Sequence, residues 1–384
     1  MALPTDSRPK LAWIQALRGI AVLLVVLTHA RYAFLDTPGW KLADELLRPG
    51  AMGVDLFFVI SGFIMVYTTR NTIGSPYEAA DFLVRRCARI WPLYALATCA
   101  WLTVNHQGFG WLTHWPQFRA LLLSLSFQPV DPDNPLYFSL SLPLGWTLNF
   151  EMYFYLLFGL CLLLRRWRWL ALVGWIAITV LLLPAYKRDL TLDVLTNFRF
   201  SFAYLNLVTN PIILEFLAGV AIGWLYLQDW FRLRSRGVAR HLVLLALCGT
   251  VWYGWSGLGT FHGPTQWGAA AALMVLALAL AGKTIELAPP PVLVWLGTIS
   301  FSLYLTHTTL QLLVTRGVQS IGGDVHGWSH VLLSTALAVS VAAMVHHYLE
   351  QRLSNMMAQV LRRAIAPLRG PAVPVADAVP LTRA

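Results

Sequence analysis

The first long apolar stretch of the chain reads Trp13-Ile-Gln-Ala-Leu-Arg-Gly-Ile-Ala-Val-Leu-Leu-Val-Val-Leu-Thr-His-Ala-Arg31. It is long and apolar enough to cross a bilayer as a helix, yet Arg18 and His29 lie within it. Eleven residues of helix turn through about 1100°, within roughly 20° of three full turns, and rise about 16 Å. The two side chains therefore share one face of the helix, about half a membrane apart. A charge inside a span costs roughly 2.5–3.5 kcal/mol on insertion scales, so we interpret the pair as functional. The simpler alternative is an interfacial Arg18 and a polar helix end at His29.

The composition indicates a protein that crosses the membrane several times. Of the 384 residues, 57% are hydrophobic and only 12% are charged, whereas a soluble domain carries about twice that share of charge. The formal net charge of +10 fits the positive bias of cytoplasmic loops. No basic patch interleaved with stacking aromatic residues indicates nucleic-acid binding. The four cysteines have no spacing typical of a metal site or a disulfide framework, so packing is their best interpretation.

Ten stretches are long enough to span a bilayer. They cover about 12–32, 53–69, 90–106, 146–164, 169–186, 207–227, 241–257, 265–282, 292–314 and 329–349. A further apolar piece, 120–127, is too short and is expected to be interfacial or re-entrant. If it did span, the arginine cluster at 165–168 would face outward, against the positive-inside rule. We therefore predict an all-α polytopic membrane protein with about ten transmembrane helices and both termini cytoplasmic.

The predicted domain organisation follows from these spans. Residues 1–350 form a transmembrane domain, and 351–366 form a short amphipathic helix on the inner leaflet. The tail 367–384 is rich in Pro and Ala and is predicted to be disordered. No internal repeat of the kind that marks many secondary transporters is evident.

Two carboxylates are expected at the level of His29. Asp55 opens the stretch 53–69 at the membrane height of the imidazole, where a carboxylate would fix the tautomer and raise the basicity of the ring. An interfacial carboxylate is the alternative. Glu151 is expected about one and a half turns inside the membrane from the outer face, with His29 or an arginine as its partner. Glu215 is a similar residue in a weaker context.

A second group of basic residues is expected at the cytoplasmic entrance. Arg86 and Arg89 are three residues apart and share a helix face. They are either ordinary positive-inside anchors or, beside Arg18, part of a cationic mouth suited to phosphates.

Several polar residues near the C-terminal end have two interpretations. Tyr304 and His307 share a helix face and serve either interhelical hydrogen bonding or the function directly. His346 and His347 lack a carboxylate or cysteine at ligand spacing, so no metal is assigned to them.

Together these stretches resemble the acyltransferase-3 family of integral-membrane acyltransferases, especially the bacterial members that O-acetylate exopolysaccharides and lipopolysaccharide. The resemblance covers about residues 11–350. It rests on five motifs in order, which are Arg18 through ten residues to His29, Gly53-Val-Asp-Leu-Phe-Phe-Val-Ile-Ser-Gly-Phe63, Arg86-x-x-Arg89, Trp146-Thr-Leu-x-x-Glu151 followed by Phe154-Tyr155, and Ser302-Leu-Tyr-Leu-Thr-His307.

By this resemblance, His29 is the catalytic histidine, and Arg18, Arg86 and Arg89 matter for an acyl-CoA donor. The expected donor is acetyl-CoA or another short acyl-CoA, and no metal is expected. The expected acceptor is a glycan or a lipid-linked saccharide. The resemblance places the protein in a bacterial cytoplasmic membrane, where polysaccharide biosynthesis machinery is a further expected partner.

A mechanism follows from these expectations. Neutral His29 takes the proton of a sugar hydroxyl, with Glu151 or Asp55 orienting its ring. Direct transfer and a transient acetyl-histidine both stay open. The candidates for binding the substrate or the oxyanion are Ser61, Asn149, Tyr304 and His307.

Two other classes of function use similar residues. A proton-coupled transporter or flippase for a glycan or lipid-linked sugar also needs buried Arg, His, Glu and Asp. A membrane scaffold within a polysaccharide synthase complex would use them for helix packing. The missing repeat, the pair Arg86 and Arg89, and the full set of motifs favour the enzyme.

Overall fold

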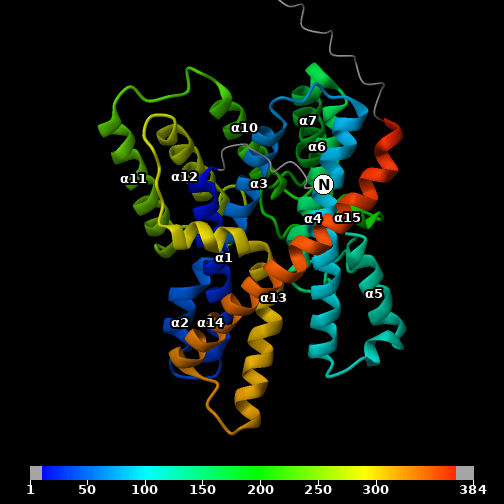
Figure 1. Cartoon of the computed structure of the whole chain (residues 1–384), viewed down its shortest axis with the longest axis vertical. Helices are drawn as coiled ribbons and strands as arrows, with labels where there is room; N and C mark the ends of the chain where they lie inside the picture. Colours follow the sequence, from blue (N-terminus) through cyan, green and yellow to red (C-terminus); the bar gives the residue numbers. More distant parts are fainter. Residues whose placement is uncertain (1–10, 369–384) are drawn as a thin grey trace, which may run out of the picture.

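The computed structural model describes residues 11–368, and this part of the chain forms helices and loops without a strand, as predicted. The helices that form the body of the molecule (Figure 1) are α1 (Ala12–Ala30), α3 (Gly53–Thr69), α4 (Pro76–Asn105), α6 (Gly145–Leu162), α7 (Arg168–Ala177), α10 (Ile213–Leu227), α11 (Arg236–Trp255), α12 (Trp267–Gly282), α13 (Pro291–Ser320) and α14 (Gly327–Val345). Shorter or peripheral helices are α2 (Trp40–Leu47), α5 (Trp115–Leu125), α8 (Leu183–Tyr186), α9 (Ala203–Val208) and α15 (Gln351–Ile365).

Each predicted span falls on one of these helices, although several differ in length from the prediction. Helix α4 begins at Pro76 rather than near residue 90, because Ser75 and Glu78 form a capping box at its start. Six helices within residues 11–368 are long and apolar enough to cross a membrane, and α10 and α12 are shorter apolar helices. Polar residues lower the hydropathy of α6 and α13. The protein is thus an all-helical, multi-pass membrane protein, and the number of ten crossings stays a prediction.

The connections between helices gather at two opposite ends of the molecule. In Figure 1 the links α3–α4, α6–α7 and α10–α11 lie at the upper end, whereas α2 and the turn between α13 and α14 lie at the lower end. At the upper end, Arg168 donates a hydrogen bond to the carbonyl oxygen of Thr72 at 3.4 Å. At the lower end, Trp255 donates one to the carbonyl oxygen of Leu46 at 2.9 Å. The links α3–α4, α6–α7 and α10–α11, all predicted to be cytoplasmic, therefore share one end.

The centre of the fold depends on two close helix crossings, α1 against α13 and α3 against α10. A Cβ atom on Gly297 would lie 1.9 Å from the carbonyl oxygen of Gln15 in α1. A Cβ atom on Gly219 would lie 2.0 Å from the carbonyl oxygen of Val59 in α3. Only glycine lets the backbones approach this closely, as at many membrane helix interfaces. The first crossing fixes the face of α1 that carries Arg18 and His29 against α13.

We expect Gly297→Ala to destabilise the protein by about 1–3 kcal/mol, because the added methyl group meets backbone that moves only with a whole helix. The measurement is thermal unfolding of the purified protein followed by tryptophan fluorescence. The control is Gly317→Ala on the same helix, where a Cβ atom meets nothing within 4 Å. Equal stability of the two variants would contradict the role of the crossing.

The short apolar piece 120–127 lies mainly in α5, a helix of 11 residues. The indole nitrogen of Trp91 donates to the carbonyl oxygen of Leu125 at 3.1 Å, so the end of α5 lies beside the middle of α4. A helix of this length spans about half a bilayer. This depth suits the re-entrant alternative.

The chain leaves α14 through a π-helical turn (His346–Glu350) and continues as α15. None of the residues of α15 is buried, and the helix packs along α4, where Arg362 pairs with Asp81 at 3.1 Å. Its position on the inner leaflet stays a prediction. Of the predicted disordered tail, only residues 367 and 368 belong to the described part of the chain.

Candidate functional site

The structure brings Arg18, Arg86, Arg89 and Glu151 together around one cavity, which we call the arginine cavity. It encloses about 770 Å³ of non-atom space, solvent opening included, and this size is typical of ligand sites. The side chains come from α1, α4 and α6, and α3 adds Ser61. Three guanidinium groups and one carboxylate leave the lining with an excess of positive charge.

The guanidinium groups are positioned by different neighbours. Arg18 donates to Ser300 Oγ at 2.8 Å, across the crossing of α1 and α13. The guanidinium of Arg86 lies 5.1 Å from the centre of the Tyr155 ring, within the range of a cation–π contact. Arg89 lies 5.9 Å from the ring of Phe301 and makes no hydrogen bond with the described residues. Most of the donors of Arg89 are therefore available to a ligand.

Glu151 differs from its prediction in depth and in partners. Ser61 Oγ donates to Glu151 Oε1 at 3.1 Å, and the hydroxyl of Tyr155 donates to the same oxygen. Neither His29 nor an arginine pairs with it within residues 11–368. The reason is that α6 starts deep in the molecule, since a Cβ atom on Gly145 would meet the Tyr94 hydroxyl at 2.6 Å. The prediction that Glu151 orients His29 is therefore wrong in geometry.

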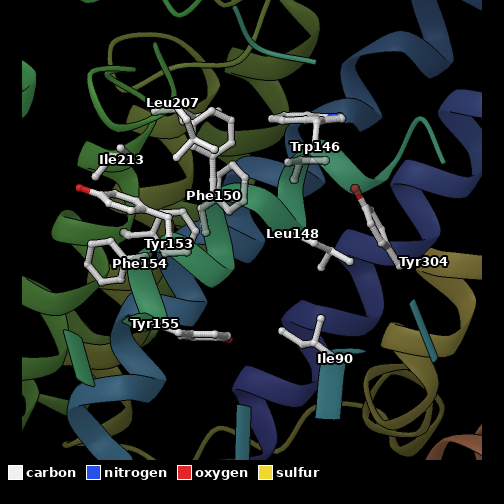
Figure 2. Close-up of a cluster of buried hydrophobic side chains, with 14 of the residues drawn as sticks. Ile90, Trp146, Leu148, Phe150, Tyr153, Phe154, Tyr155, Leu207, Ile213 and Tyr304 are labelled. Carbon is white, nitrogen blue, oxygen red and sulfur yellow. The ribbon is translucent and has the colours of Figure 1, made fainter. Parts of the chain in front are cut away.

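One face of helix α6 packs in the hydrophobic core, and the opposite face lines the arginine cavity. Figure 2 shows Phe150, Tyr153 and Phe154 on one side, with Leu207 and Ile213. Leu148 and Tyr155 lie on the other side, toward Ile90 and Tyr304. The aromatic core thus holds the helix, while its opposite face is exposed to the cavity.

A second cavity of about 820 Å³ of non-atom space contains His29, and we call it the histidine cavity. Tyr32, Tyr137, Trp146 and His262 also line it. The lining comes mainly from the C-terminal part of α1, from the segment before α6 and from the segment between α11 and α12.

Val54 and Tyr304 line both cavities, so the two spaces are separated by about one layer of side chains. The hydroxyl of Tyr304 lies 2.9 Å from Thr147 Oγ1 and is directed toward the start of α6 (Figure 2). The face of α1 that carries Arg18 and His29 therefore has the arginine cavity at one end and the histidine cavity at the other. Val54 and Tyr304 form the wall between the two cavities.

The tautomer of His29 follows from its neighbours. Its Nδ1 lies 2.9 Å from the carbonyl oxygen of Val25, and a carbonyl oxygen only accepts, so Nδ1 carries the proton. The same argument places the proton of His307 on Nδ1, which lies 2.8 Å from the carbonyl oxygen of Tyr304. His307 Nε2 is then an acceptor, 3.3 Å from His29 Nδ1. In neutral His29 the remaining nitrogen, Nε2, has a free lone pair.

His307 therefore takes the place that the sequence analysis gave to a carboxylate. It is fully buried and contacts the His29 ring edge-on, with ring centres 5.0 Å apart. This neutral contact orients the ring without adding charge. Tyr304 and His307 share one face of α13, as predicted. The hydroxyl of Tyr304 contacts Thr147, whereas His307 contacts His29.

Asp55 is also directed away from His29. It is fully buried and accepts hydrogen bonds from His262 Nδ1 at 2.8 Å and from the backbone N–H of Gly263 at 3.1 Å. The prediction that Asp55 orients His29 is therefore wrong in geometry, because the segment between α11 and α12 folds back and supplies another histidine. Sequence reasoning missed His262, and the run Phe261-His-Gly-Pro264 just before an apolar stretch is the signal that was available.

Two further polar residues complete the comparison with the sequence. Asn149 is fully buried, lines neither cavity, and its side chain has no hydrogen-bond partner within the described residues. Glu350 accepts from Ser302 Oγ at 2.5 Å and from His346 Nδ1 at 2.8 Å. The prediction that His346 lacks a carboxylate at ligand spacing is therefore wrong, because Glu350 follows it by one helical turn. In the described part of the chain, no three His, Cys, Asp or Glu side chains are grouped to hold a metal ion.

Comparison with known proteins identifies the family of the chain. The family model described as "Acyltransferase domain" matches residues 11–347. The chain belongs to the acyltransferase-3 family. This acyltransferase-3 chain is 32% identical over 312 residues to the exopolysaccharide production protein ExoZ of Rhizobium meliloti, with 79% of this chain and 90% of that protein covered.

The acyltransferase-3 chain also has two shorter matches. It is 38% identical over 79 residues to the putative membrane-bound transacylase BcsY of Komagataeibacter xylinus, covering 21% of this chain and 16% of that protein. It is 32% identical over 85 residues to protein 2 in the picA locus of Rhizobium radiobacter, covering 22% of this chain and 40% of that protein. No solved structure matches significantly.

Proposed function

We propose that this acyltransferase moves an acetyl group from cytoplasmic acetyl-CoA to a sugar hydroxyl of an exopolysaccharide or another surface glycan, across the bacterial cytoplasmic membrane. The observation that carries the proposal is the pair of cavities that share Val54 and Tyr304. One cavity offers arginines to an anionic donor, and the other offers a positioned imidazole to an acceptor. The name of the relative ExoZ supports an exopolysaccharide acceptor.

In this proposal the arginine cavity binds the donor. Acetyl-CoA is anionic at its nucleotide end, and guanidinium groups bind phosphates with strong, charge-assisted hydrogen bonds. Arg86 and Arg89 hold the phosphates, and Arg18 holds the beginning of the pantetheine arm. Glu151 Oε2, which no described residue binds, accepts from an amide N–H of that arm. The arm then passes Tyr304 and brings the thioester to His29.

His29 acts on the acceptor in the histidine cavity. Its Nε2 takes the hydroxyl proton while the sugar oxygen attacks the thioester carbonyl carbon. The tetrahedral intermediate then collapses, the C–S bond breaks, and the same nitrogen returns the proton to the leaving thiolate. His307 holds the ring through Nδ1 throughout. Tyr304, which lines both cavities, offers its hydroxyl to the developing oxyanion.

The orientation of the protein gives the test of this function. We expect inside-out membrane vesicles to transfer label from added radioactive acetyl-CoA to enclosed glycan, because they expose the arginine cavity to the medium. Right-side-out vesicles at equal protein abundance should transfer little until they are permeabilised. Vesicles from cells that lack the gene are the control. Equal labelling in both orientations of intact vesicles would refute donor entry from the cytoplasm.

A further inference from the structure

A second histidine, His262, also lines the histidine cavity. His262 belongs to the segment between α11 and α12 and is 7% exposed. His29 and His262 come from elements far apart in the sequence and contribute to the same lining. The mechanism above uses only the first of them.

Asp55 fixes the tautomer of His262. With Asp55 ionised, its Oδ1 accepts from the backbone N–H of Gly263 and its Oδ2 accepts the proton of His262 Nδ1. Neutral His262 then has a lone pair on Nε2, which makes no hydrogen bond with the described residues.

Three aromatic rings hold the imidazole in place. The ring centres of Trp146, Phe261 and Trp267 lie 5.3, 5.2 and 5.4 Å from that of His262. Trp146, Phe261 and Trp267 also line the cavity. Aromatic faces with a few fixed polar groups are what a sugar ring needs, because its C–H face is apolar and its rim carries hydroxyl groups.

Two buried carboxyl groups stand next to His262, and removing carboxyl groups from water costs free energy. Next to Asp55 lies Glu215, which is 1% exposed and whose carboxyl group interacts with that of Asp55 and with the backbone of Gly263. A Cβ atom on Gly268 would lie 2.4 Å from Glu215 Oε1, so the backbone is closed tightly around this carboxylate. Apolar residues of similar size would pack here without the desolvation penalty of buried acids. Packing alone therefore does not account for the cluster.

We infer that His262, oriented by Asp55, binds the acceptor sugar: its Nε2 accepts a hydrogen bond from a hydroxyl group of the saccharide, while His29 acts on the hydroxyl that is acylated. The inference rests on the proposed function and names a second contact in the same site. Asp55 is a positioning residue in this arrangement, since it contacts the histidine and not the sugar.

The test compares His262→Gln with wild type in purified enzyme supplied with acetyl-CoA. The acceptor probe is oligosaccharide prepared from the deacetylated exopolysaccharide of the organism. We expect the apparent KM for the oligosaccharide to rise at least tenfold, with the affinity for acetyl-CoA unchanged within twofold. Asp55→Asn should change KM in the same direction. The control is His114→Gln, an exposed histidine that lines neither cavity.

An unchanged KM in His262→Gln would overturn the inference, and so would a parallel loss of acetyl-CoA affinity, which indicates a structural role. A measurement without substitution applies even if the variants do not fold. Saturating oligosaccharide should slow modification of His262 by diethyl pyrocarbonate in the wild-type enzyme, read by peptide mass spectrometry, and leave His114 unaffected. Absence of protection also overturns the inference. Failure of the proposed function is distinct, because His29→Ala would then retain transfer.

Discussion

Replacement of His29 by alanine is expected to lower acyl transfer by roughly 10²–10⁴-fold, the usual contribution of a general base. The structure leaves Nε2 of His29 as the free nitrogen in the histidine cavity, because Nδ1 is engaged by the carbonyl oxygen of Val25 and by His307. The neighbouring imidazole of His307 has no free nitrogen, because its Nδ1 is bound to the carbonyl oxygen of Tyr304 and its Nε2 faces His29. The measurement is the O-acetyl content of the surface polysaccharide in cells with matched membrane abundance of the two proteins.

Two comparisons separate base catalysis from a loss of structure. Purified His29→Ala should bind acetyl-CoA as wild type does, because the donor contacts lie in the other cavity. His307→Gln should retain part of the activity, since it removes only the group that orients the ring. Full acetylation by His29→Ala, at equal abundance, would eliminate His29 as the base.

The sequence predicts which residues line the two cavities better than it predicts which of them contact one another. The spacing from Arg18 to His29 predicts one helix face, and the structure has a cavity at each end of it. The apolar stretches predict the helices, because membrane burial imposes length and composition directly. Both features depend only on positions along one helix.

Pairing between helices depends on depth and on loops, which hydropathy does not report. Glu151 was placed too near the outer face because α6 begins beside Tyr94, in the middle of α4. Asp55 was assigned to the wrong histidine because the segment that carries His262 folds back into the molecule. Both errors concern carboxylates. The partner of a buried carboxylate depends on which helices and loops pack around it, and the local sequence does not specify that packing.

Removal of both Arg86 and Arg89 is expected to weaken acetyl-CoA binding at least a hundredfold. A hydrogen bond to a charged group contributes about 1.5–3 kcal/mol, and two such losses correspond to roughly two orders of magnitude or more in Kd. The guanidinium of Arg89 makes no hydrogen bond with residues 11–368, and that of Arg86 makes one of 3.4 Å to Thr68. Both groups are therefore free to bind phosphate without first breaking strong contacts. Titration of the purified double variant Arg86→Ala/Arg89→Ala measures the effect.

S-acetyl-pantetheine decides whether these arginines act on the phosphates, because it keeps the thioester and the arm but carries no phosphate. Wild type should prefer acetyl-CoA strongly over S-acetyl-pantetheine, and the double variant should bind the two almost equally. Arg85→Ala is the matched control, because Arg85 lies on the same helix, is exposed, pairs with Asp81 and does not line the arginine cavity. If the double variant lost affinity for both ligands to the same extent, the arginines would be maintaining the shape of the cavity. Only a selective loss of acetyl-CoA binding identifies this end of the molecule as the place where the nucleotide is held.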